Sequence, residues 1–162
     1  IQNGALSSAP TRYRLAAAPT FDVGGLEDDP ELEFNARRGE VWAVPLRSGG
    51  LAVLDVSRVQ VFSSNGTRLH VIGRDGSGPR EFRAVYTGCS LAGDTLLIAD
   101  GSLSRLSVLA PNGTFVRTAQ SDDARAVGRY ACFDDGTVLA VRMVQQRGAK
   151  AVVEAVRLDA LG

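Results

Sequence analysis

The chain has 162 residues, enough for one domain with a sizeable core, and its 44% apolar and 22% charged residues are ordinary for a globular protein. Eighteen basic and eighteen acidic side chains give a formal net charge of zero. This balance argues against a nucleic-acid binder that neutralises phosphates and against a polybasic membrane-surface module. No stretch approaches the roughly 18 consecutive apolar residues of a membrane-spanning helix.

Residues 1–39 are interpreted as an N-terminal extension. The chain begins at Ile1 without a basic-then-apolar leader. It is therefore either a mature form whose export signal has been removed or a segment of a longer polypeptide. Residues 11–26 are expected to supply one or two strands of a preceding unit. Residues 27–38 are rich in acidic side chains and are expected to form an exposed loop.

Residues 40–162 repeat one pattern of runs and turns. Residues 50–73 and 93–118 each contain an apolar run that ends in an aspartate, a second run, an Asn-Gly-Thr turn and a third run. The two aspartates, Asp55 and Asp100, are 45 residues apart, and a weaker third copy opens at Asp135. Self-similarity at a period of roughly 40–50 residues, with several short strands in each period, is typical of β-propeller blades.

Strand signals dominate this region, and no window of 11 or more residues has a clean helical period. Asn-Gly and Asp-Gly pairs between the runs suit tight hairpin turns, because they accept positive φ at little cost. The runs group into three units at about 40–73, 85–120 and 127–159, and the pattern leaves open whether the third unit has its outermost strand. We predict strands at 41–46, 51–55, 58–63, 68–73, 86–91, 95–100, 105–109, 114–118, 137–143 and 151–158.

The run Val59–Phe62, the turn Asn65-Gly66, Ile72-Gly73 and the segment 76–82 (Gly-Ser-Gly-Pro-Arg-Glu-Phe) resemble the six-bladed β-propeller proteins related to the NHL repeat. Arg80 stands where those proteins usually have a glycine. The resemblance covers about residues 40–142. It implies an all-β fold of propeller-like antiparallel blades, and little about activity, because the members of the family are mostly exported binding or scaffold proteins.

Six blades at this period need roughly 270 residues, whereas 162 residues hold about three and a half. The chain is therefore part of a longer polypeptide or an open, incomplete propeller. An open arc leaves unpaired strand edges, which soluble proteins normally cover or blunt. A second copy, the rest of a longer chain or another subunit could cover them.

The loop at residues 73–82 holds three glycines and two arginines, which superficially suggests a phosphate cradle. A true phosphate-binding loop opens a helix whose N-terminus holds the anion, whereas strands are predicted on both sides of this loop. We therefore interpret it as a connection between two blades.

His70 is the only histidine in the chain. No local spacing gives it the carboxylate or thiolate partners of a metal site, and a catalytic triad would have to be built around this one residue. We interpret it as an ordinary strand residue.

Acidic residues cluster at 27–33, 122–123 and 134–135, but none of these clusters matches a twelve-residue calcium loop. We interpret them as solvated turns and predict no metal and no cofactor. Both Asn-Gly-Thr turns match the glycosylation sequon, but their repetition explains them as turns, so no glycan is assigned.

Cys89 and Cys132 are 43 residues apart, the spacing that also separates Gly93 from Gly136. We therefore place them at equivalent positions on the inner strands of adjacent blades. Such positions converge near a propeller axis, and a disulfide needs Cα atoms within about 7 Å of each other. We favour two buried thiols; the alternative is a disulfide, which would imply an oxidising compartment.

These observations favour a non-catalytic interaction module, exported to the bacterial periplasm or cell surface, that serves as an accessory or scaffold subunit of a larger, membrane-anchored complex. The expected partners are protein subunits that cover the open strand edges, with no nucleic acid and no direct membrane span. We expect the interface to use residues 1–26, residues 143–162 and the loop 73–83. Arg74, Arg80 and Phe82 are the predicted anchors, because arginine and aromatic residues concentrate at interface hot spots.

Two other classes stay open. Half of a six-bladed enzyme of the lyase or lactonase kind would need a central cation and several inward histidines or carboxylates, and one histidine counts against it. A carbohydrate- or ligand-binding propeller would need exposed aromatic residues at one mouth. Aromatic residues make up only 6% of the chain, and its single tryptophan, Trp42, lies in an apolar run.

Overall fold

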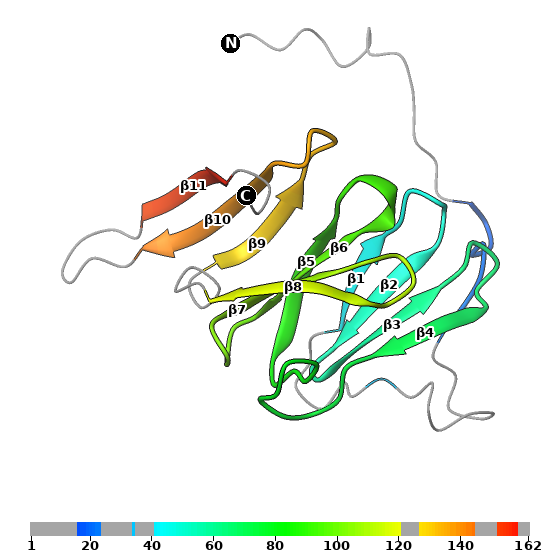
Figure 1. The fold of residues 1–162 in the computed structure, drawn as a ribbon. Coiled ribbons are helices and arrows are strands. Elements are labelled where there is room, and N and C mark those ends of the chain that lie inside the picture. The colour runs from blue at the N-terminus through cyan, green and yellow to red at the C-terminus, as the bar shows by residue number, and fades with distance from the viewer. Residues whose placement is uncertain (1–15, 24–33, 35–40, 121–126, 145–151, 159–162) are drawn as a thin grey trace, which may run out of the picture.

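The computed structural model describes residues 16–23, 34, 41–120, 127–144 and 152–158. Within these residues the fold is almost entirely β. Eleven strands form three antiparallel sheets, and the helical content is one 3-10 turn at Ala92–Asp94. The sheets follow one another in an open, propeller-like arrangement (Figure 1). The predicted all-β fold of propeller-like antiparallel blades is confirmed.

Each sheet is a meander in which every strand pairs with the next one along the chain. Sheet one contains β1 (Trp42–Pro45), β2 (Leu51–Asp55), β3 (Arg58–Phe62) and β4 (Arg68–Ile72). Sheet two contains β5 (Val85–Ser90), β6 (Leu96–Asp100), β7 (Arg105–Leu109) and β8 (Phe115–Gln120). Sheet three contains β9 (Val127–Cys132), β10 (Val138–Val144) and β11 (Val152–Leu158). Among the described residues, sheet three therefore has no fourth strand.

All ten predicted strands are present, with ends within two residues of the predicted ones. The eleventh strand, β9, was not predicted as a strand. Its sequence places Gly128 and Arg129 between Val127 and Tyr130, which weakens the strand signal. The strand is stabilised by its backbone pairing with β10, which the local sequence does not predict.

The first strands of the three sheets are neighbours, with β5 between β1 and β9. Two apolar clusters fill the spaces between the sheets. The cluster between sheets one and two contains Val44, Ala52, Leu54, Val59, Val61, Ile72, Phe82, Val85, Leu96, Ile98 and Leu109. The cluster between sheets two and three contains Cys89, Leu91, Leu97, Ala99, Leu106, Val108, Tyr130, Val138 and Ala140.

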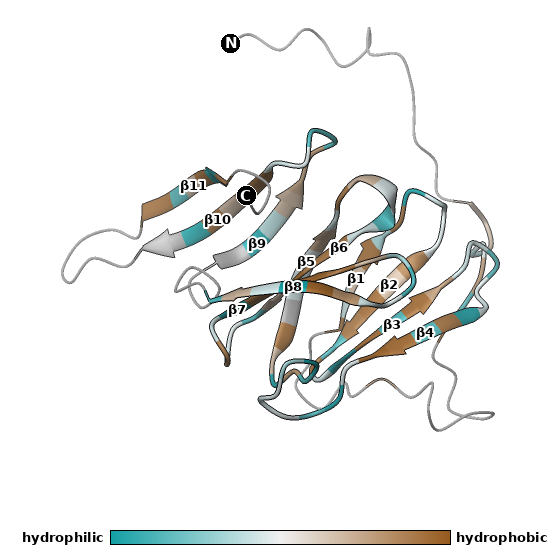
Figure 2. Ribbon diagram, in the orientation of Figure 1, coloured by the Kyte–Doolittle hydropathy of each residue, from teal (hydrophilic) through white to brown (hydrophobic). Residues whose placement is uncertain are grey.

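Sheet two is covered on both faces, and this explains the sequence of its central strands. Every residue of β6 and β7 is buried. Strands that are buried on both faces have nearly continuous apolar runs in place of an alternating pattern. The run of residues 96–99, Leu-Leu-Ile-Ala, is of this kind, and Figure 2 shows the apolar colouring of the strands around it.

The Asn-Gly hairpins of sheets one and two have the same backbone structure. Gly66 and Gly113 have φ angles of +85° and +80°. Each donates its N–H to the carbonyl three residues earlier, at 3.0 and 2.9 Å. In each turn the asparagine side chain, of Asn65 or Asn112, accepts a hydrogen bond from the threonine N–H two residues later. The predicted repeat of this hairpin is confirmed.

An ion pair closes the second hairpin of sheet one, and sheet three has an ion pair at the equivalent place with its charges exchanged. In sheet one, Arg58 on β3 donates to Asp55 on β2, with an Nε···Oδ2 distance of 3.0 Å. In sheet three the cation is Arg142 on β10 and the anion is Glu154 on β11, with an Nη2···Oε2 distance of 2.8 Å. The attraction is preserved although the residue types are reversed.

None of the helical segments in the described part of the chain has the length and apolar character needed to cross a membrane.

Candidate interaction surface

The loop between sheets one and two is shaped by glycines that pack against two side chains. Gly73 has a φ of +86°, and a Cβ atom at this position would lie 2.4 Å from the ring of Phe82. Gly76 has a φ of +151°, and its Cβ would lie 2.1 Å from the carboxylate of Glu81. Only glycine fits both the backbone and the space at these two positions. The N–H of Phe82 donates to the carbonyl of Arg74 at 2.9 Å and closes the loop.

Glu81 is held inside this loop by two donors. Its carboxylate accepts the N–H of Gly78 at 2.8 Å and the Nε–H of Arg74 at 2.9 Å. These hydrogen bonds, of which the one from Gly78 is the stronger influence, lower the pKa of Glu81 from its ordinary value of 4.5. Glu81 is therefore an ionised structural residue of the loop.

Arg105 fastens the loop to sheet two. This arginine lies at the start of β7 and is 6% exposed. Its Nη1 donates to the carbonyl of Gly78 at 2.8 Å, and its Nη2 donates to the carbonyl of Glu81. The same side chain thereby holds two points of the loop, so the loop has a fixed shape.

The structure separates the three predicted anchors. The side chain of Arg74 is 82% exposed although it pairs with Glu81, and Arg80 is also exposed. Phe82 is 0% exposed, because its ring packs in the core between sheets one and two and stacks on Phe115 at 5.7 Å. The prediction that Phe82 is a surface anchor is wrong, since its aromatic ring is already used inside the fold.

Two shallow grooves flank the loop. One, of about 460 Å³, lies between β4 and the hairpin that joins β7 to β8, and the half-buried His70 is part of its wall. The other, of about 450 Å³, is formed by the loop itself. Arg80 lines both grooves, so a partner bound in either groove would contact this residue.

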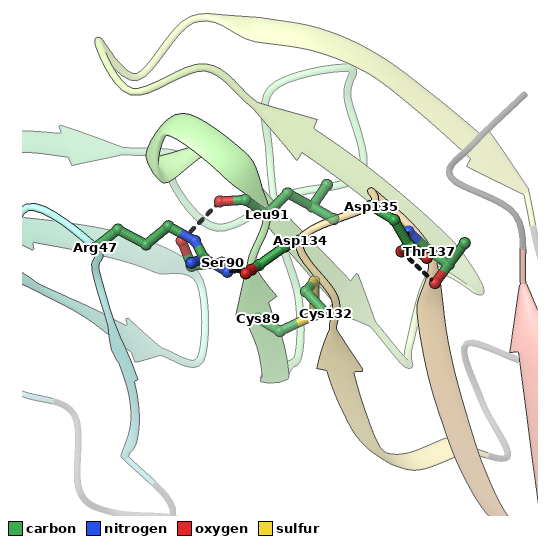
Figure 3. Close-up of a disulfide and its surroundings, with 8 residues drawn as sticks. All are labelled: Arg47, Cys89, Ser90, Leu91, Cys132, Asp134, Asp135 and Thr137. Carbon is green, nitrogen blue, oxygen red and sulfur yellow. Dashed lines mark hydrogen bonds and ion pairs between the residues drawn. A yellow bond between two sulfur atoms is a disulfide. The ribbon is translucent and has the colours of Figure 1, made fainter.

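Cys89 and Cys132 form a disulfide bond between sheets two and three, with a Cα–Cα distance of 5.6 Å (Figure 3). The expectation of two free buried thiols is therefore wrong, and the alternative holds. The assumption of equivalent positions was also wrong, by one residue. Strand pairing aligns Leu96 with Ser90 in sheet two and Val138 with Cys132 in sheet three.

This offset is the physical reason why the bond can form. Successive side chains of a strand point to opposite faces of a sheet. Cys89 pairs with Leu97, whose side chain faces sheet three, whereas Cys132 pairs with Val138, whose side chain faces sheet two. Two cysteines at truly equivalent positions would point in the same direction around the arc and would not meet.

Charged residues join the turns at one end of the inner strands. In the turn after β1, Arg47 forms an ion pair with Asp134 from the turn after β9 (Figure 3). The backbone N–H of Arg47 also donates to Asp94, in the turn after β5, at 2.5 Å. Both residues of the acidic pair 134–135 therefore make structural contacts: Asp134 pairs with Arg47, and Asp135 accepts hydrogen bonds from Thr137. Those bonds, chiefly the one from the Thr137 hydroxyl, lower the pKa of Asp135 below 3.8.

The inner strands β1, β5 and β9 line a groove of about 470 Å³. Trp42 forms part of its wall, and the guanidinium of Arg129 lies 4.8 Å from the centre of the Trp42 ring. This contact places a cation over an aromatic face. In the described part of the chain, no group of three or more His, Cys, Asp or Glu residues is arranged to hold a metal ion.

Sheet three has an uncovered face on the side away from sheet two, where apolar residues lie beside Arg129 and Arg157. In sheet two, Leu97 and Ala99 are buried against sheet three. Leu139 and Val141 of β10 occupy the same positions, relative to the turn before the strand, as Leu97 and Ala99 of β6. Both are only half-buried. Val153 on β11 is 62% exposed. Sheet three therefore leaves uncovered the face that the first two sheets use to contact the next sheet, and this face carries Arg157 where sheet one has the buried Val61.

Several predicted features lie outside the described residues. These are the acidic clusters at 27–33 and 122–123, most of the interface segment 1–26, and residues 145–151 and 159–162 of the second interface segment.

No protein-family model matches the chain, and no curated protein matches it. Among solved structures, the chain is similar to a protein of Bacteroides fragilis that is named as a candidate exported protein. The two share 18% sequence identity with a TM-score of 0.54, over 75% of this chain and 40% of the other. A protein of unknown function from Bacteroides caccae matches with 17% identity and a TM-score of 0.41, over 74% of this chain and 45% of the other.

The likeness to the Bacteroides fragilis protein supports the fold alone, because the identity is low. The matched part of the chain corresponds to less than half of the length of either solved structure.

Proposed function

We propose that this chain is a non-catalytic protein-interaction module of the NHL-related, six-bladed propeller type, exported as an accessory or scaffold subunit of a larger assembly. The observation that carries the proposal is the uncovered face of sheet three, on which apolar side chains are left partly exposed. Leu139 and Val141 occupy positions that the first two sheets bury, and burying apolar surface is the main favourable term in protein association. A protein partner would complete that burial.

Export is supported by two independent observations. The disulfide between Cys89 and Cys132 is of a kind that persists in oxidising compartments such as the bacterial periplasm. The solved structure from Bacteroides fragilis, which shares the fold, is named as a candidate exported protein. We therefore place the subunit in the periplasm or on the cell surface.

A binding role also fits the loop between sheets one and two. Its shape is fixed by Arg105 and its glycines, and it carries the exposed cations Arg74 and Arg80 at its surface. A loop whose backbone is already fixed avoids the backbone ordering cost of binding, and arginine is enriched at hot spots. Arg80 is our choice for the second contact point, since it lines both grooves.

Photocrosslinking in the natural cell tests the proposal. A photoreactive residue at Leu139 should give a defined protein adduct in the periplasmic or cell-surface fraction, and Val141→Asp should abolish it. The matched control is position 116 on β8, where Val116 is 59% exposed but belongs to a sheet with four strands. Equal labelling at both positions, or no adduct at Leu139, would contradict the proposed function.

A further inference from the structure

The outer edge of sheet three is open. In sheets one and two the third strand is paired on both sides, because β4 and β8 add a fourth strand. Among the described residues, β11 pairs with β10 alone. The matching strand β7 is buried throughout, whereas Val152, Val153 and Val156 of β11 are all exposed. An exposed apolar edge strand is a template for the addition of another strand.

Residues 16–23 lie where a fourth strand would lie in a sheet that precedes sheet one. Strand β4 packs closely against the hairpin after β7. A Cβ atom added to Gly113 would lie 3.1 Å from Ile72 and 3.7 Å from His70, both on β4. In the matching hairpin after β3, the position of a Cβ on Gly66 is 3.2 Å from Phe21. Residues 16–23 therefore pass the hairpin of sheet one as β4 passes the hairpin of sheet two (Figure 1). No described sheet includes this segment.

The sequence that follows this segment repeats the loop after β4. Gly24 and Pro30 have the same spacing as Gly73 and Pro79, and each prolyl segment ends in Glu-Phe, at Phe34 and Phe82. Aligning the two glycines places Phe21 opposite His70 and Val23 opposite Ile72. The described elements thus run in the order of a fourth-strand segment, two four-stranded sheets and a three-stranded sheet. Together they supply the strands of three complete blades.

We propose that a second copy of this chain supplies the missing strand, with its residues 16–23 pairing antiparallel to β11. The register follows from sheet one, where Ile72 pairs with Val59 and His70 with Val61. The positions on β11 that match Val59 and Val61 are Ala155 and Arg157, by their pairing with β10. Val23 of one copy is therefore opposite Ala155 of the other.

Two such exchanges between two copies close a ring of six blades. The exposed face of sheet three of one copy then meets sheet one of the other copy, on the side where Phe34 packs against Phe62. The contact between consecutive sheets within a chain is thereby repeated between the copies. This continuity with the two existing sheet–sheet contacts is the reason to prefer a second copy. The inference rests on the proposed interaction function and names the partner of that function.

Cysteine crosslinking tests the pairing. Both native cysteines are already in the disulfide, so an introduced cysteine is the only free thiol. Two differently tagged forms, one with Val23→Cys and one with Ala155→Cys, should form a covalent mixed dimer when co-expressed, and neither form should crosslink alone. Thr20→Cys in place of Val23→Cys is the off-register control and should stay uncrosslinked. No mixed dimer, or equal crosslinking at position 20, would overturn the register.

Light scattering on the unmodified chain supplies a readout that needs no variant. The mass should be double the 17.1 kDa of one chain. A monomer that still gives a photoadduct with a different protein at Leu139 would overturn the second-copy proposal and leave the proposed function standing. A double variant carrying both cysteines that links only within one chain would also overturn it.

Discussion

Cys89 of sheet two and Cys132 of sheet three lie one residue out of register with each other, and because of this offset their side chains face each other across the boundary between the sheets. The bond closes a loop over a sequence separation of 43 residues. It is therefore expected to restrict the unfolded chain strongly and to fasten sheet three, which has fewer strands than its neighbours.

The double variant Cys89→Ser/Cys132→Ser should lose about 4 kcal/mol of unfolding free energy, the value expected from chain entropy for a loop of this size. Urea unfolding of the two proteins measures the difference. A reducing agent should destabilise the natural protein and leave the double variant unchanged. Equal stability of both proteins under oxidising conditions would contradict a stabilising role for the bond.

Arg105→Leu should destabilise the protein by roughly 2–3 kcal/mol, because two carbonyls of the loop lose a charged donor. Limited proteolysis should then cut within residues 73–82, where the natural protein resists. Arg74→Ala is the matched control. Its ion pair is mostly solvent-exposed, so the change should cost at most about 1 kcal/mol. Similar losses for both variants would show that Arg105 does not hold the loop.

Gly73→Ala and Gly93→Ala separate steric clash from backbone strain. Both glycines have positive φ angles, so both variants should lose on the order of 1–2 kcal/mol from the backbone. Gly73→Ala should lose roughly 1–3 kcal/mol more, because its methyl group would collide with Phe82, whereas nothing lies within 4 Å at Gly93. Thermal unfolding of the two variants ranks them, and a larger loss for Gly93→Ala would refute this assignment of the loop.

The pKa of Glu81 predicts acid sensitivity. Since the folded state lowers this pKa below 4.5, the stabilisation by Glu81 is present above that pH and is lost as the pH falls through the folded pKa. Glu81→Gln should therefore be less stable than the natural protein near neutral pH, and the two melting temperatures should converge at more acidic pH. A constant difference across the titration would mean that the charge of Glu81 does not matter.

Repetition made the sheets predictable from sequence. The 45-residue spacing of Asp55 and Asp100, with the repeated Asn-Gly turns, locates two complete sheets because each turn needs a positive φ at its glycine. The strand β9 was missed because its stability comes from pairing with β10. The copy of the loop after β4 at residues 23–34 was also missed, although the shared spacing of Gly24 and Pro30, followed by Glu33-Phe34, could have revealed it.

The candidate site was less predictable, because it depends on which way side chains face. The sequence predicts that Phe82 is an interface residue, but the absence of a side chain at Gly73 leaves room for its ring inside the core. The disulfide depended on a shift of a single residue in strand register, and sequence spacing alone does not resolve such a shift. The exposed face of sheet three becomes visible only when the burial of matching positions is compared.

The disulfide also determines how the chain would carry mechanical tension. A pull along the backbone passes from Cys89 on β5 to Cys132, the last residue of β9, through the disulfide, so β6, β7, β8 and the rest of β9 carry no load. The 43-residue separation would otherwise contribute roughly 150 Å of extended length. The last three strands of sheet two are thereby shielded from stretching until the bond is reduced.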